Sequence, residues 1–203
     1  MISVDSLWVY PVKSLAGIPC RKAELTADGL RYDRYWMVCD EAGLFVSQRE
    51  LPLMSTITTA MTATTLRLSC TGRGEIDVPL LQAGGQPSTA TVWRSVCRGL
   101  DEGATVSRWL TNCLGEFRGG ALRLVRMQPG FTRFIDDPPW LRGERSQARF
   151  ADAYPFLVCS QQSLAVLNRK IESGGGSPVP MNRFRPNIVV TGLAALQEYQ
   201  LDS

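Results

Sequence analysis

Apolar and polar residues alternate with a period of two along much of the first 127 residues, which is the pattern of half-buried β-strands. Turn-forming residues, such as Asp28 and Gly29, separate the alternating segments. The segments that this pattern predicts as strands, some with a turn inside them, are residues 2–10, 15–30, 34–40, 44–48, 64–70, 75–80, 90–96 and 122–127. So many short strands divided by turns predict a mainly antiparallel β-barrel.

Two segments have the period of a helix instead. Apolar side chains recur at spacings of three and four in residues 105–114, and Gly115 follows as a stop signal. A second helix is predicted after Ser160, a good N-cap residue that follows a short buried strand at residues 156–159. The apolar stripe of this helix, which we expect to be buried, consists of Leu164, Leu167 and Ile171. Many strands with few helices predict an α+β fold.

Residues 181–190 are predicted to form one extended strand, whose side chains alternate between two faces. Arg183, Arg185 and Asn187 then share the face opposite the apolar residues. Two guanidinium groups fixed on a stiff strand suit a multiply charged anion. The alternative is that both arginines are surface groups paired with acidic neighbours.

The first turn of the predicted second helix offers a further anion site. This turn begins at Ser160 and Gln161, and its free backbone N–H groups lie at the positive end of the helix dipole. If this helix terminus and the arginines of residues 181–190 converge, a phosphate-type ligand would fit between them.

Composition excludes several classes of function. The 203 residues include no histidine, which rules out Ser-His-Asp triads, Cys-His dyads and His-ligated zinc. The six cysteines form no C-x-x-C pair, and the net charge of +3 is too small to indicate nucleic-acid binding. No apolar run approaches the roughly 20 residues that span a bilayer, and the N-terminus lacks a signal peptide pattern. We therefore expect a cytoplasmic protein with reduced thiols and with neither a nucleic-acid nor a membrane partner.

Polar residues at the ends of the predicted strands are candidates for a ligand site. Lys13 and Ser14 follow the first strand, and Arg34 lies at the mouth of a predicted hairpin. The alternatives are a solvated lysine in a loop and a salt bridge from Arg34 to a neighbouring carboxylate. Asp136 and Asp137 lie in the long connection at residues 128–147, where we expect turn residues rather than catalytic carboxylates.

Three stretches taken together resemble the MOSC family and its N-terminal β-barrel partner domain. They are residues 10–14, 31–38 and 183–187, and residues 152–155 also fit. The resemblance implies an N-terminal β-barrel domain over residues 1–127 and a connecting loop over residues 128–147. Residues 148–203 would then be the first part of a mixed α/β barrel MOSC domain.

The family, which includes the mitochondrial amidoxime reducing component, implies a function. It implies an oxidoreductase that binds a molybdenum cofactor (molybdopterin), reduces N-hydroxylated compounds and receives electrons from a partner protein. The cofactor-binding residues implied by the resemblance and by the anion sites are Lys13, Ser14, Arg34, Ser160, Gln161, Arg183, Arg185 and Asn187. No residue is identified as catalytic or as a metal ligand. The alternatives are a sulfur carrier or sulfurtransferase of the same family, and a non-catalytic anion-binding or interaction domain. Pyridoxal phosphate is a further phosphate ligand that such a site would suit.

The resemblance also predicts what residues 1–203 lack. In the family, a cysteine in the later part of the second domain binds molybdenum. None of the six cysteines of this chain lies after Asn187. We therefore expect the chain as given to hold no stoichiometric molybdenum and to be inactive as an oxidoreductase.

Overall fold

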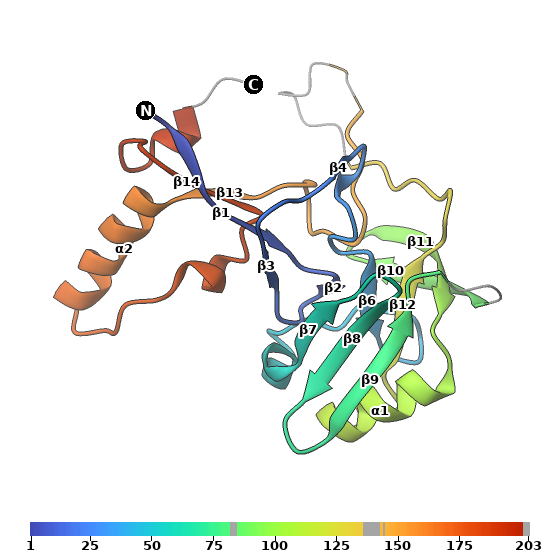
Figure 1. Ribbon diagram of the computed structural model, residues 1–203. Coiled ribbons are helices and arrows are strands. Elements are labelled where there is room, and N and C mark those ends of the chain that lie inside the picture. The colour runs from blue at the N-terminus through green and yellow to red at the C-terminus, as the bar shows by residue number, and fades with distance from the viewer. Residues whose placement is uncertain (82–84, 136–142, 144, 201–203) are drawn as a thin grey trace.

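A computed structural model describes residues 1–81, 85–135, 143 and 145–200 (Figure 1). Its strands are β1 Ser3–Val9, β2 Val12–Lys13, β3 Ile18–Cys20, β4 Leu25–Thr26, β5 Gly29–Leu30, β6 Trp36–Cys39, β7 Thr58–Met61, β8 Thr65–Cys70, β9 Gly74–Pro79, β10 Gln86–Val92, β11 Ser95–Asp101, β12 Arg123–Met127, β13 Val158–Ser160 and β14 Ile188–Thr191. The α-helices are α1 Ala104–Leu114 and α2 Gln161–Ser173, and the short 3-10 helices are η1 Pro52–Thr56, η3 Met181–Phe184 and η4 Gln197–Gln200.

The predicted α+β fold with mainly antiparallel strands is confirmed. The strands form sheets in the orders β10-β11-β12-β6-β2, β7-β8-β9, β4-β5 and β13-β14-β1-β3. Only the β2–β6 and β13–β14 pairs are parallel among the described strands. None of the sheets in the described part of the chain closes on itself, so the closed barrel that we expected is not seen there.

The main core lies between the five-stranded sheet, the three-stranded sheet and α1, which packs against β9 and β12 (Figure 1). The helix predicted at residues 105–114 is confirmed as α1, and Val106 and Leu110 are buried as its period requires. This core also encloses an ion pair. The side chains of Arg126 and Glu102 are 3% and 1% exposed, with 2.5 Å between Nε and Oε1. Trp36 donates a second bond to the same carboxylate at 2.6 Å.

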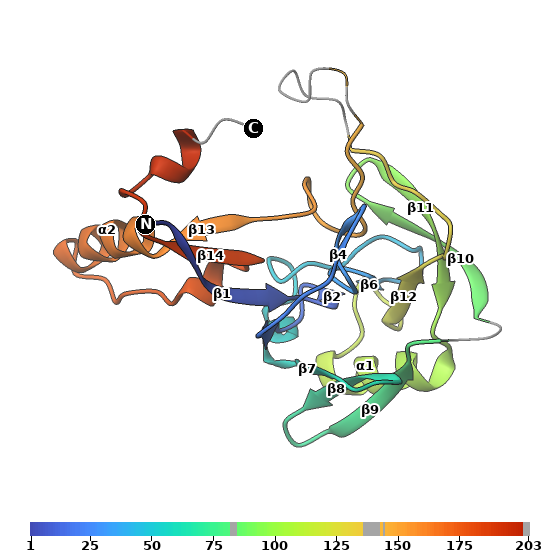
Figure 2. The ribbon, with the colours of Figure 1, turned by 45° about the horizontal axis from the view of Figure 1, so that its top comes forward.

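The four-stranded sheet combines strands from the two ends of the chain. β1 pairs with β14 through Ser3–Thr191 and with β3 through Val9–Ile18, and β13 lies beyond β14. Figures 1 and 2 show β1, β13 and β14 side by side, with α2 next to them. One sheet therefore holds strands from both of the predicted domains, whose boundaries stay a prediction.

The predicted strand over residues 181–190 is wrong for its first half. Met181–Phe184 is a 3-10 turn, Arg185 has the left-handed conformation (φ 59°, ψ 45°), and strand pairing begins at Ile188. Phe184 is consequently 40% exposed instead of lying in the core. The arginines of this segment therefore do not share one strand face with Asn187, because the backbone turns between them.

The second helix matches its predicted start but not its predicted burial. Ser160 is the N-cap of α2, and its side chain accepts a hydrogen bond from the Ser163 N–H at 3.1 Å. No residue of α2 is fully buried, and Leu167 of the predicted stripe is 38% exposed. The reason is that α2 packs mainly against the narrow strip formed by β13 and β14. The preceding strand is also not buried, since Val158 is 39% exposed.

The single strand predicted at residues 90–96 is wrong. This segment contains the end of β10, a turn at Trp93 and Arg94, and the start of β11, which pairs with β10 as a hairpin. Asp136 and Asp137 lie outside the described residues. In the described part of the chain, no helix has the length and apolar character needed to cross a bilayer.

Candidate functional site

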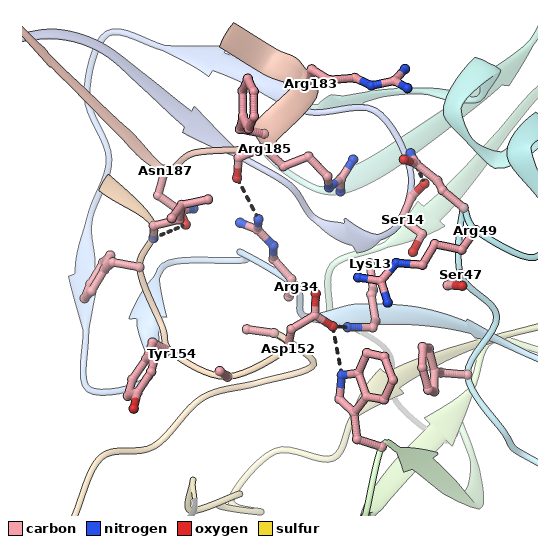
Figure 3. Close-up of a pocket in the computed structure, with 18 residues that line it drawn as sticks. Lys13, Ser14, Arg34, Ser47, Arg49, Asp152, Tyr154, Arg183, Arg185 and Asn187 are labelled. Carbon is pink, nitrogen blue, oxygen red and sulfur yellow. Dashed lines mark hydrogen bonds and ion pairs between the residues drawn. The ribbon is translucent and has the colours of Figure 1, made fainter. Parts of the chain in front are cut away.

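A cavity of about 480 Å³ opens where segments distant in sequence meet (Figure 3). These segments are the end of β2, the turn before β6, the chain after it, the β10–β11 turn, and the approaches to β13 and β14. The cavity is lined by Lys13, Ser14, Arg34, Phe45, Ser47, Gln48, Arg49, Trp93, Ala151, Asp152, Ala153, Tyr154, Phe156, Leu157, Arg183, Phe184, Arg185 and Asn187. Five of these side chains are cationic and one is anionic, so the cavity is strongly positive.

Six of the eight residues predicted to bind a ligand line this cavity. They are Lys13, Ser14, Arg34, Arg183, Arg185 and Asn187. Ser160 and Gln161 do not line it. Figure 3 shows Lys13, Arg34, Arg49 and Arg185 pointing into a common space around Asp152.

Tyr10 holds two of the arginines in place. Its ring is 1% exposed and lies between two guanidinium groups, 4.3 Å from Arg34 and 4.4 Å from Arg185. A Cβ on Gly17 would lie 2.3 Å from the Tyr10 ring, so only glycine leaves room for it there. The buried Asp33 carboxylate accepts from the Tyr10 N–H at 2.7 Å and from Arg34 at 2.6 and 2.5 Å. The aromatic ring and the carboxylate thereby fix the direction of Arg34.

Arg185 has bonding capacity that the described residues do not use. Its Nη1 donates to the Leu15 carbonyl at 2.6 Å, and its own carbonyl accepts from Arg34 at 3.1 Å. Its Nη2 is buried and has no hydrogen-bond partner among the described residues. Burial, and then the charge of Arg34, lower the pKa of Arg185 to about 10. A buried cation with an unused donor is stabilised by an anion.

Lys13 and Asp152 form a pair at the base of the cavity. Lys13 is 5% exposed and donates to the Phe150 carbonyl at 3.0 Å and to Asp152 at 2.5 Å. Burial lowers the pKa of Lys13, and the Asp152 carboxylate opposes that effect. Burial alone would raise the pKa of Asp152, but Lys13 outweighs it and lowers this pKa. The ion pair between the two side chains therefore opposes the loss of charge that burial favours at each of them.

Asn187 serves the fold at the edge of the cavity. It is 2% exposed, its amide oxygen accepts from the Leu157 N–H at 3.2 Å, and its amide nitrogen donates to the Trp8 carbonyl at 3.3 Å. These bonds tie β1 to the chain before β13. Little of the Asn187 side chain remains free for a ligand.

The N-terminus of α2 is not open to the cavity. Ser160 is 1% exposed and donates to the carboxylate of Glu198 at 3.2 Å. Burial would raise the pKa of Glu198, but hydrogen bonds from Ser163 and Ser160 lower it. Gln161 donates instead to Asp5 at 2.9 Å. The convergence of the helix terminus with Arg183 and Arg185 is therefore not found, because Glu198 takes the position of an anion at this terminus.

The cavity concentrates unusual backbone conformations. Ser14, Arg34, Trp93 and Arg185 have φ between 47° and 69°, and all four line the cavity. Non-glycine residues in the left-handed region cost free energy, and such conformations cluster at functional sites. This distribution marks the cavity as a site whose side-chain directions are set by the surrounding fold.

The polar and aromatic lining residues that sequence reasoning missed include three with strong chemical character, Arg49, Trp93 and Asp152. Arg49 follows a short extended segment, Trp93 is in a hairpin turn, and Asp152 lies in a segment without regular structure. Only Asp152 had a signal in the sequence, since residues 152–155 fit the family resemblance. The fold alone brings Arg49 and Trp93 to the site.

These side chains fit the phosphate end of an anionic cofactor. The unused Nη2 of Arg185, the Ser14 hydroxyl and the ammonium of Lys13 are donors suited to phosphate oxygens. The described residues contain no group of three or more Cys, Asp or Glu side chains that could hold a metal ion.

Two models of known protein families match most of the chain. The model of the MOSC N-terminal beta barrel domain matches residues 1–117, and the model of the MOSC domain matches residues 145–202. Human mitochondrial amidoxime-reducing component 1 is 33% identical over 210 residues, which cover 98% of this chain and 59% of that protein. Human mitochondrial amidoxime reducing component 2 is 32% identical over 203 residues, which cover 97% and 58%.

A second kind of relative aligns with most of the chain. The molybdenum cofactor sulfurase of Danio rerio is 31% identical over 204 residues, which cover 93% of this chain and 24% of that protein. The chain therefore spans less than two thirds of the length of each of these relatives. Because the first domain model alone matches residues 1–117 of 203, the chain belongs to the MOSC family.

Proposed function

We propose that the cavity binds the phosphate end of a molybdopterin-type cofactor, and that the chain is part of an oxidoreductase acting on N-hydroxylated compounds. The observation that carries the proposal is the buried Nη2 of Arg185, which has no partner among the described residues in a cavity with five cationic side chains. The names of the amidoxime-reducing relatives support the choice of reaction.

Three of the five cationic residues, Lys13, Arg34 and Arg185, have separate parts in binding. Arg185 donates through its unused Nη2, while Arg34 supplies charge from a guanidinium already fixed by Asp33. Lys13 keeps one N–H free after its bonds to Phe150 and Asp152, and the Ser14 hydroxyl lies beside it. The bound cofactor would supply the redox chemistry, while these residues hold and orient it.

A second candidate is the handling of sulfur on the same cofactor. The observation that favours it is the similarity to a molybdenum cofactor sulfurase over 93% of the chain. The two candidates share the phosphate site. Labile sulfane sulfur on the isolated protein would favour sulfur handling, whereas reduction of N-hydroxylated compounds by the longer protein would favour the oxidoreductase.

The shared phosphate site is tested by calorimetric titration of the protein with inorganic pyrophosphate and with a pterin phosphate. Arg185→Ala removes a charge-assisted hydrogen bond worth about 1.5–3 kcal/mol, so its affinity should fall by about ten- to a hundredfold. Arg67→Ala is the matched control, because Arg67 is exposed and paired with Asp77 outside the cavity. Equal affinities for the wild type and Arg185→Ala would reject the site.

A further inference from the structure

Two cysteines outside the cavity lie together at the edge of the main core. Cys70 is the last residue of β8, and Cys113 is the second-last residue of α1. Both thiols are free, both side chains are partly buried, and both pack against the same hydrophobic cluster. Figures 1 and 2 show α1 lying against the three-stranded sheet that contains β8. A bond between the two sulfurs would join the helix to the sheet.

The direction of each cysteine side chain follows from the period of its element. Along β8, Leu66 and Leu68 are fully buried, and Cys70 continues this alternation on the same face. Along α1, Cys113 lies three residues after the buried Leu110 and shares its inward face. The facing surfaces of the sheet and the helix therefore present the two cysteines to each other.

The two thiols also interact directly. Burial raises the pKa of Cys113 to about 12, together with a hydrogen bond between Cys113 and Cys70 and with the charge of Cys70. The charge of Arg73, in the turn after β8, opposes this effect. A thiol that stays protonated is a weak nucleophile. Cys70 is therefore the member of the pair that we expect to react first with an oxidant.

Cys70 is also open to a reagent on one side. Its partner in β9 is Gly74, which has no side chain, and a Cβ built there would meet no atom within 4 Å. A small molecule can therefore approach the Cys70 sulfur beside β9. Cys39 and Cys97 differ, because they are 0% and 1% exposed. Both should stay reduced under conditions in which Cys70 reacts.

We propose that Cys70 and Cys113 form a dithiol site that a small disulfide, such as oxidised glutathione, converts into an intramolecular disulfide bond. The Cys70 thiolate attacks the reagent, whose S–S bond breaks, and one glutathione leaves while the other stays in a mixed disulfide. Cys70 then carries no charge, which removes one of the causes that keep Cys113 protonated. The Cys113 sulfur attacks the Cys70 sulfur and releases the second glutathione. The two cysteines lose two electrons and two protons, and the reagent gains them as two thiols.

The disulfide bond would change stability without changing the cavity. It would link α1 to β8 across 113 − 70 = 43 positions of the chain. A disulfide stabilises mainly by restricting the unfolded chain, so the oxidised protein should unfold at a higher guanidinium chloride concentration than the reduced protein. Dithiothreitol should reverse this shift. Pyrophosphate affinity should be the same in both forms, because neither cysteine lines the cavity, and the inference is therefore independent of the proposed function.

The experiment treats the folded protein with oxidised glutathione, blocks the remaining thiols with a maleimide, and maps the tryptic peptides by mass spectrometry without reduction. Cleavage after arginine places Cys70 in residues 68–73 and Cys113 in residues 109–118, and these two peptides should be found linked. Cys113→Ser should stop at a mixed disulfide of Cys70 with glutathione, and Cys70→Ser should form no internal bond. Cys20→Ser is the matched control, because it removes a partly buried cysteine of β3 and should leave the linked peptides unchanged.

Three outcomes would overturn the inference, once thermal unfolding has confirmed that each variant is folded. The first is the absence of the linked peptides from the oxidised wild type. The second is a link that forms only when denaturant is present. The third is a linked protein that is no more stable than the reduced protein, since the folded structure would then not accommodate the bond.

Discussion

Replacing Tyr10 by phenylalanine should stabilise the protein, although the Tyr10 ring contacts two arginines of the site. Its hydroxyl oxygen is buried and has no hydrogen-bond partner among the described residues. An unsatisfied buried polar group costs about 1–3 kcal/mol, so the free energy of unfolding should rise by a similar amount in Tyr10→Phe. The phenyl ring keeps its contacts with Arg34 and Arg185, so pyrophosphate affinity should be retained.

Tyr10→Leu tests the role of the ring itself. The change removes two cation–π contacts at 4.3 and 4.4 Å and leaves a cavity between the guanidinium groups. A desolvated cation–π contact is worth about 2 kcal/mol, and large-to-small core substitutions cost about 2–5 kcal/mol. We expect a loss of about 3–5 kcal/mol in stability and about a tenfold loss of pyrophosphate affinity, because the arginines lose their fixed direction.

The assays are chemical unfolding in guanidinium chloride and calorimetric titration with pyrophosphate. Unfolding also gives a pH test, because burial raises the pKa of Tyr10 to about 12 against the opposing guanidinium charges. The unfolded-state pKa is about 10, so this contribution to stability is complete below about pH 10 and is lost as the pH rises to about 12. Burial also raises the pKa of Cys39 to about 12, so the difference between wild type and Tyr10→Phe isolates Tyr10. A Phe variant less stable than the wild type by more than about 1 kcal/mol would refute the reasoning, since the hydroxyl would then have a partner.

Three further substitutions test other parts of the structure by chemical unfolding. Ser160→Ala should lower the free energy of unfolding by about 0.5–2 kcal/mol, because the N-cap of α2 is lost. Added pyrophosphate should stabilise this variant as much as the wild type, since Ser160 is outside the cavity, and a smaller effect in the variant would place the anion at the helix. Gly17→Ala should cost about 1–3 kcal/mol, because its methyl group would meet the Tyr10 ring, and a neutral result would mean that the ring can move. Glu102→Ala should cost about 3–5 kcal/mol, because it leaves the buried charge of Arg126 unpaired, and a loss below about 1 kcal/mol would indicate that water reaches the guanidinium.

Helices and strands were predictable where the sequence pattern of a segment agrees with the contacts that its residues make to near neighbours in the chain. α1 follows from its three- and four-residue spacing and from the stop at Gly115. The start of α2 follows from the N-cap Ser160, and the β8–β9 hairpin follows from alternation around a glycine-containing turn. Each depends on residues close together in sequence, so one sequence is sufficient to find them.

The geometry of the site was not predictable, because distant contacts override local preference there. Arg185 precedes a proline, and such residues are normally extended. Here Arg185 is left-handed, since its side chain bonds to Leu15 and stacks on Tyr10 while its carbonyl accepts from Arg34. Trp93 likewise enters the cavity only because Asp152, 59 residues later, holds its indole N–H. Sequence pattern could name most of the ligand-binding candidates, but not the directions in which they point.

The pairing of β1 with β14 has a consequence for how the chain folds during synthesis. Ser3 pairs with Thr191, so 191 − 3 = 188 residues separate these partners. Synthesis proceeds at about 5–20 residues per second, so β14 is made roughly 10–40 s after β1. During that time the edge of β1 that β14 will cover is unpaired. An unpaired strand edge is prone to join another chain, and pairing across so long a loop is intrinsically slow. Until β14 is made, the Ser3–Leu7 edge of β1 is therefore the place where a strand of another unfinished chain would compete with β14.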